Sequence, residues 1–171
     1  MDRLRCALAP LLACLGLTAC SGEHALVIEL GTDLPLPAAN TSLDLAISQG
    51  GKALFLQRYA VDHPSAEGGQ SLPATLVLVD ADASAPRRGT LSPGLLLVPG
   101  EGPLQISASL SKGEAVEVLR AAQVGMPGAG TRVLRMDLES ACVGVACGAG
   151  TTCQAAKCVS SEVDADSLPE L

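Results

Sequence analysis

Residues 104–114 read LQISASLSKGE, and this stretch decides the fold. Apolar and polar residues alternate through Leu110, as in a strand with one buried and one exposed face. Residues 111–114 then predict a tight turn, because Gly113 tolerates a positive φ. Residues 115–122 alternate only imperfectly and would also suit a helix by propensity, but pairing with residues 104–110 favours a strand. The stretch therefore predicts a β-hairpin.

Similar short runs, separated by Gly, Pro, Ser and Asp, extend outward from this hairpin through residues 25–139. Gln49-Gly50-Gly51-Lys52 predicts a second hairpin turn, since paired glycines accept positive φ at low cost. Residues 32–37 are too rich in proline for a central strand. The remaining candidate strands, all apolar or alternating, are residues 26–30, 43–48, 53–61, 73–79, 95–98 and 132–138.

About seven short strands in a region of this size predict an all-β fold, an antiparallel β-sandwich of immunoglobulin-like or fibronectin-like size. A small barrel is the alternative. No Cys…Trp…Cys framework is present, so a true immunoglobulin domain is not expected. The core must be aliphatic, because Phe55 and Tyr59 are the only aromatic residues.

The N-terminus has the pattern of a secretory signal: Arg3 and Arg5, then residues 6–19 without a charge. Leu17-Thr18-Ala19-Cys20 ends this run and resembles the lipobox of bacterial lipoproteins. The resemblance implies that residues 1–19 are removed and that Cys20 becomes a lipidated first residue, with residues 20–24 as a tether. Ser21 follows the cysteine where an aspartate would retain such a protein at the inner membrane, so the resemblance implies the outer membrane.

Seven cysteines are present, of which two lie in the signal and Cys20 carries the lipid. The other four, Cys142, Cys147, Cys153 and Cys158, predict two disulfides in residues 140–160, because the count is even and the compartment is oxidising. A structural zinc site is the alternative, but the gaps of four and five residues are wider than in the usual zinc knuckle.

This C-terminal spacing, C-x4-C-x5-C-x4-C, resembles the compact cysteine knot that closes many Gram-negative envelope lipoproteins and is similar to part of an EGF module. The resemblance implies the pairs Cys142–Cys153 and Cys147–Cys158. It implies location and architecture only, because no activity is attached to this group. Residues 161–171 form an acidic tail, which is expected to be solvated and disordered.

Composition excludes several classes of partner. Removing residues 1–19 leaves 9 basic and 17 acidic residues, a net charge of about −8, which gives no electrostatic footprint for nucleic acid. One tyrosine and no tryptophan argue against carbohydrate binding. The leading hypothesis is a lipid-anchored, non-catalytic envelope protein without cofactor or metal, which presents loops or a sheet edge to a partner protein or acts as a spacer. The alternative is a hydrolase or calcium-dependent binder that uses His63 or the loop with Asp80 and Asp82.

Overall fold

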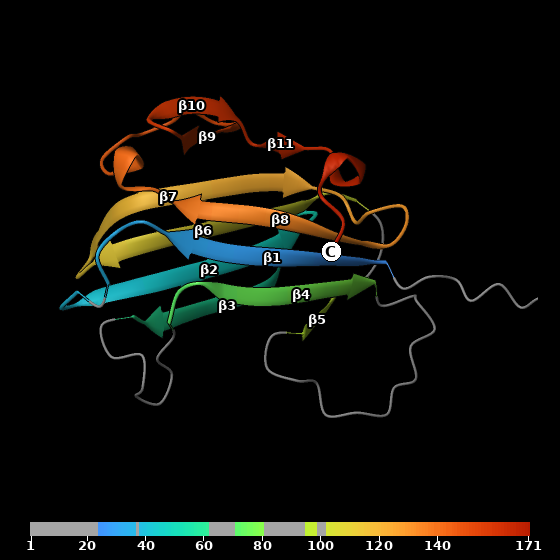
Figure 1. Ribbon diagram of the computed structural model, residues 1–171, viewed down its shortest axis with the longest axis horizontal. Helices are drawn as coiled ribbons and strands as arrows, with labels where there is room; N and C mark the ends of the chain where they lie inside the picture. The colour runs from blue at the N-terminus through green and yellow to red at the C-terminus, as the bar shows by residue number, and fades with distance from the viewer. Residues whose placement is uncertain (1–23, 37, 62–70, 81–94, 99–101) are drawn as a thin grey trace, which may run out of the picture.

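The computed structural model describes residues 24–36, 38–61, 71–80, 95–98 and 102–171, which form two β-sheets packed face to face and a small C-terminal module along one side (Figure 1). The strand orders are β11-β7-β6-β2-β3 and β5-β4-β1-β8, where β11 is the short strand Glu162–Val163. The predicted all-β class with a disulfide-stapled C-terminal module is confirmed. The strands of the sandwich are β1 Ala25–Thr32, β2 Thr41–Gln49, β3 Lys52–Ala60, β4 Ala74–Asp80, β5 Leu95–Val98, β6 Leu104–Lys112, β7 Ala115–Val124 and β8 Thr131–Leu138.

The core between the sheets is aliphatic, as the composition requires. Alternate residues of β1 and β2 belong to it, which is the period of two read from the sequence: Leu26, Ile28, Leu30, Leu43, Leu45 and Ile47. Its largest fully buried side chains come from both sheets: Leu26, Ile28, Leu43, Ile47, Leu78, Leu104, Ile106, Leu110, Met136, Leu138, Val98 and Val124.

Both predicted hairpins are present. Gly50 and Gly51, at the β2–β3 turn, have φ of 55° and 78°, the left-handed conformation for which glycine is suited. In the β6–β7 hairpin, Leu110 pairs with Val118 but the next residue pairs with Val116, so Glu117 is an extra residue in a β-bulge. This bulge explains why the alternation of residues 115–122 is imperfect although they form a strand.

The four-stranded sheet is mixed, and here the prediction of an antiparallel sandwich needs correction. β1 pairs with β4 in the antiparallel sense, but β1 pairs with β8 in parallel, and so does β4 with β5. Parallel neighbours are not joined by a local turn, so strand alternation carries no information about their direction.

Residues 161–171 are ordered, so the prediction of a disordered tail is wrong. We call them the C-terminal strap, because they cross from β7 in one sheet to β8 in the other (Figure 1). β11 (Glu162–Val163) lies parallel to β7, and the N–H of Val133 in β8 donates to the carbonyl of Pro169 (2.9 Å). Between these contacts the short helix η2 (Ala165–Ser167) buries Ala165.

The acidic residues of the strap are engaged, which is why their charge does not keep it in solvent. Asp164 caps η2 by accepting from the N–H of Asp166 (3.1 Å). The Asp166 carboxylate accepts from the N–H of Gly128 (2.9 Å), and Glu170 pairs with Arg132 (3.4 Å). Composition alone cannot distinguish such paired acids from solvated ones.

Candidate functional site

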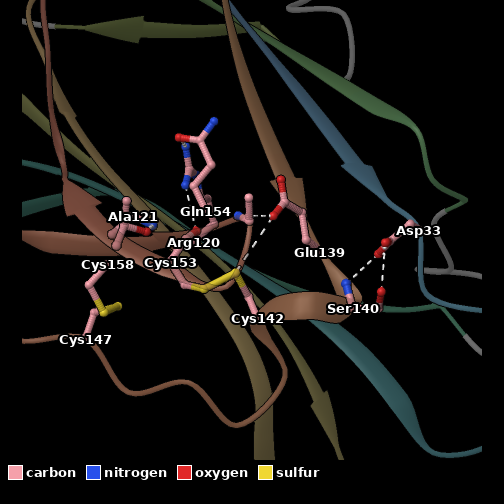
Figure 2. Close-up of a disulfide and its surroundings, with 12 residues drawn as sticks. Asp33, Arg120, Ala121, Glu139, Ser140, Cys142, Cys147, Cys153, Gln154 and Cys158 are labelled. Carbon is pink, nitrogen blue, oxygen red and sulfur yellow. Dashed lines mark hydrogen bonds between the residues drawn. A yellow bond between two sulfur atoms is a disulfide. The ribbon is translucent and has the colours of Figure 1, made fainter.

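The two disulfides form with the predicted pairing, in a module that lies along β7 (Figure 2). Cys142 belongs to the helical turn η1 (Ser140–Cys142) and is bonded to Cys153 in β9 (Thr151–Gln154). Both residues are buried and belong to the core of the sandwich. The second bridge joins Cys147 to the exposed Cys158 of β10 (Lys157–Ser160). One disulfide therefore extends the core, and the other staples the outer part of the module.

Arg120 of β7 holds this module against the sandwich. Its Nη1 donates to the carbonyl of Cys153 (2.6 Å) and its Nη2 to Oε1 of Gln154 (3.2 Å). Burial lowers the pKa of the guanidinium, and the charges of Glu139 and Asp137 oppose that shift. Arginine stays charged at any physiological pH, so Arg120 is a permanent cation between β7 and the cysteine module.

The backbone of β7 makes further contacts with the module. The N–H of Ala121 donates to Oγ1 of Thr152 (2.8 Å). The carbonyl of the bulge residue Glu117 accepts from the N–H of Gly144 (2.9 Å). The cysteine module therefore occupies an edge that would otherwise expose unpaired backbone groups.

Two carboxylates fix the start of the module. Asp33 accepts hydrogen bonds from the N–H and the Oγ–H (2.8 Å) of Ser140, and these bonds lower the pKa of Asp33, the backbone bond most. Glu139 accepts from the N–H of Ala155. The same Glu139 oxygen lies 3.9 Å from Sγ of Cys142, without a hydrogen bond because a disulfide sulfur carries no proton.

These carboxylates line a shallow groove of about 660 Å³ between the module and the ends of β1 and β8. Its third acid, Asp137, is exposed and lies over Gly31, where a Cβ would come within 2.6 Å of its Oδ1. Since Asp33 and Glu139 already bind the backbone of the module, the groove presents an acidic surface without a histidine or thiol among its lining residues. Its residues are Gly31, Thr32, Asp33, Leu72, Pro73, Asp137, Glu139, Ala141 and Ala155.

The other sequence-predicted site residues are not brought together. Cys20, His63 and Asp82 lie outside the described residues, and Asp80 is the last residue of β4. Within the described ranges, no group of three His, Cys, Asp or Glu residues is arranged to hold a metal ion. No helix in the described part of the chain is long and apolar enough to cross a membrane.

Sequence reasoning missed the residues that dock the module. Arg120 did carry a signal, since it lies two residues from both Val118 and Ala122 and therefore on the inward side of β7. A cation at such a position must find buried partners. Asp33 and Glu139 carried none, because their partners lie 107 and 16 residues away in the chain.

Asp33→Asn should lower the free energy of unfolding at pH 7, because the amide lacks the charge that strengthens both bonds from Ser140. The folded pKa of Asp33 lies below its ordinary value of 3.8, so this stabilisation is present above that pH and is lost as the pH falls through the lowered pKa. Urea unfolding at pH 7 and near pH 2 measures both. Glu114→Gln, at an exposed turn position, is the control. An equal effect of Asp33→Asn at both pH values would contradict the prediction.

The turn between β9 and β10 offers a stabilising change. Ala155 and Ala156 have φ of 47° and 61°, which costs an L-residue with a side chain about 1–2 kcal/mol. Ala156→Gly should therefore raise the free energy of unfolding by roughly 0.5–1 kcal/mol, after the greater freedom of glycine in the unfolded chain is subtracted. Ala115→Gly, at an exposed strand position, should instead be destabilising, and thermal unfolding of both variants checks the contrast. A loss of stability with Ala156→Gly would show that the positive φ of Ala156 does not strain the folded protein.

Comparison with known proteins gave no relatives: no family model, curated protein or solved structure matches the chain.

Proposed function

We propose that this protein is a lipid-anchored protein of the bacterial envelope, held on the outer membrane through Cys20, and that it is a non-catalytic module that binds another envelope protein. The observation that carries the proposal is the combination of a lipobox-like sequence at residues 17–20 with two formed disulfides at the other end of the chain. Disulfides persist in oxidising compartments, which an exported protein reaches.

The position of the groove supports a binding role. β1 begins beside the proposed tether and runs to Thr32, which lines the groove. Its eight residues extend about 26 Å, whereas a five-residue tether spans at most about 18 Å. If β1 stands upright on the membrane with Ala25 nearest to it, the groove at the Thr32 end of β1 faces away from the membrane. The side chains that line the groove already hold the cysteine module, so their arrangement suits display of a rigid surface better than catalysis.

The test is processing in cells. Intact-mass measurement of membrane-extracted protein should show residues 20–171 with an added lipid mass, and Cys20→Ala should abolish that mass and release the protein from membranes. Cys14→Ala, within the signal, is the matched control and should leave lipidation intact. Wild-type protein that is soluble, unlipidated and begins at another residue would refute the anchoring.

The binding role has a separate test. Crosslinking in intact cells followed by mass spectrometry should recover one reproducible envelope partner. If no partner is recovered while the lipid is present, the protein is an anchored spacer and the binding role is wrong.

A further inference from the structure

β3 is the outermost strand of the five-stranded sheet and pairs only with β2 among the described residues. The edges on the other side of the sandwich are occupied, β7 by the cysteine module and β11, and β8 by the strap. Exposure supports the free edge independently: the middle of β3 is open to solvent, with Leu56 74% exposed.

The hydrogen-bond pattern shows which backbone groups face outward. The N–H of Val61 donates to the carbonyl of Thr41, and Val61 continues the register in which Tyr59 and Gln57 lie opposite Leu43 and Leu45. The register shifts at Leu54, because Phe55 pairs with Ile47 but Ala53 pairs with Ser48. In an antiparallel pair, bonded and non-bonded positions alternate, so the odd-numbered residues from Phe55 onward bond to β2. Leu56, Arg58 and Ala60 therefore direct their N–H and C=O groups away from the sheet. The Arg58 carbonyl accepts a hydrogen bond there from Nε2 of Gln57 (3.2 Å), an exposed side chain that an added strand would displace.

The side chains of β3 are unusual for this protein. Both of its aromatic residues, Phe55 and Tyr59, lie on this strand, partly buried against the core. Leu56 projects on the opposite face with little cover. Large apolar and aromatic side chains beside outward-facing backbone groups are the features by which a sheet edge recognises an added strand.

The charge of β3 contrasts with the rest of the chain. The strand carries Lys52 and Arg58 and no acid, in a protein of net charge −7. Arg58 makes a two-fold contact with Asp44 of the inner strand β2 (2.6 and 2.9 Å), which offsets part of its charge, but 69% of the Arg58 side chain stays exposed. Lys52 has an exposed side chain at the turn end.

We propose that β3 docks an extended segment of another polypeptide, in which apolar residues alternate with acidic ones. Main-chain hydrogen bonds to Leu56 and Arg58 provide the pairing, and the apolar residues contact Leu56 on one face or Phe55 and Tyr59 on the other. The acids meet Lys52 and the exposed part of the Arg58 side chain. This inference rests on the proposed binding function and names the surface and the chemistry of the partner.

A second copy of the chain fits this edge less well. Antiparallel pairing of two β3 strands would offer the Lys52 of each copy no acidic residue on the other strand, because β3 contains none. Such pairing would also make the strands of the two copies run in opposite directions, so that the N-terminal ends of the two β1 strands would lie at opposite ends of the dimer. Tethers of about 18 Å at most would hinder anchoring of two such upright copies in one membrane.

Binding of labelled nine-residue peptides to the full chain, purified in detergent, tests the inference. One peptide alternates Glu and Val, and a second alternates Lys and Val. Fluorescence anisotropy should detect the acidic peptide, with affinity at least about tenfold above that of the basic one. Leu56→Pro should weaken binding by about tenfold, because it removes an outward N–H without removing a bond to β2. Leu56→Ala keeps that N–H and should weaken binding less.

Each contrary outcome is distinct. No binding of the acidic peptide, equal binding of both peptides, or full binding by Leu56→Pro would overturn the inference. Sedimentation that shows a dimer lost in Leu56→Pro would replace the proposed segment by a second copy. Thermal unfolding of the variants separates loss of binding from loss of the fold. Failure here leaves the crosslinking test of the binding function unaffected, since another surface could hold the crosslinked partner.

Discussion

Replacing Cys142 and Cys153 together by alanine is expected to lower the free energy of unfolding by about 4 kcal/mol, against about 3 kcal/mol for Cys147 and Cys158. The two bridges close loops of equal length, with a sequence separation of 11 residues each, so the chain-entropy contribution is the same. The difference comes from burial: Cys142 and Cys153 are 2% and 3% exposed, and their loss leaves a cavity beside the core.

Urea unfolding of the two double variants measures this difference, and the pair at Cys147 and Cys158 serves as the matched control. Near-ultraviolet and amide spectra should show that the sandwich of the control variant is unchanged. If the two double variants lost equal amounts of unfolding free energy, burial of the Cys142–Cys153 bridge would contribute nothing beyond loop closure.

Ending the chain after residue 161 should lower the free energy of unfolding by roughly 3 kcal/mol, because it exposes the edges of β7 and β8 and removes apolar contacts of the strap with the core. Three strap side chains, Val163, Ala165 and Leu168, pack within or against that core. Burial of these side chains outweighs the conformational entropy that is lost when the strap is ordered. The hydrogen bonds of the strap to β8 and Gly128 offset part of that loss.

Two leucines provide a matched point test of the same idea. Leu168→Ala should cost about 1.5 kcal/mol, since this side chain packs against the core, whereas Leu171 is 81% exposed and its replacement should change stability by less than about 0.5 kcal/mol. Hydrogen exchange should show faster opening of the β8 amides, including Val133, in the truncated chain. If truncation left both stability and exchange unchanged, the strap would be an accessory to the fold.

Local patterns were sufficient wherever the structure depends on neighbours in sequence. The alternation of residues 104–110 and the glycines of two turns correctly gave the β6–β7 and β2–β3 hairpins, because strand period and turn geometry are short-range properties. The number and spacing of the last four cysteines likewise predicted two disulfides, and the family resemblance gave their pairing.

Only the tertiary structure decided how the ends of the chain are used. The parallel pairing of β1 with β8 joins residues about a hundred positions apart, and no local signal specifies its direction. The acidic C-terminus has the composition of a solvated tail, yet it is a strap, because Arg132, Gly128 and the core offer its charged and apolar groups partners. The docking of the cysteine module through Arg120 and Asp33 has the same origin. Sequence by itself therefore determined the main strands and turns of the sandwich and the disulfides of the C-terminal module. The fold determined which charges are bound and, among the described residues, which strand edges are paired, because both depend on contacts between distant segments.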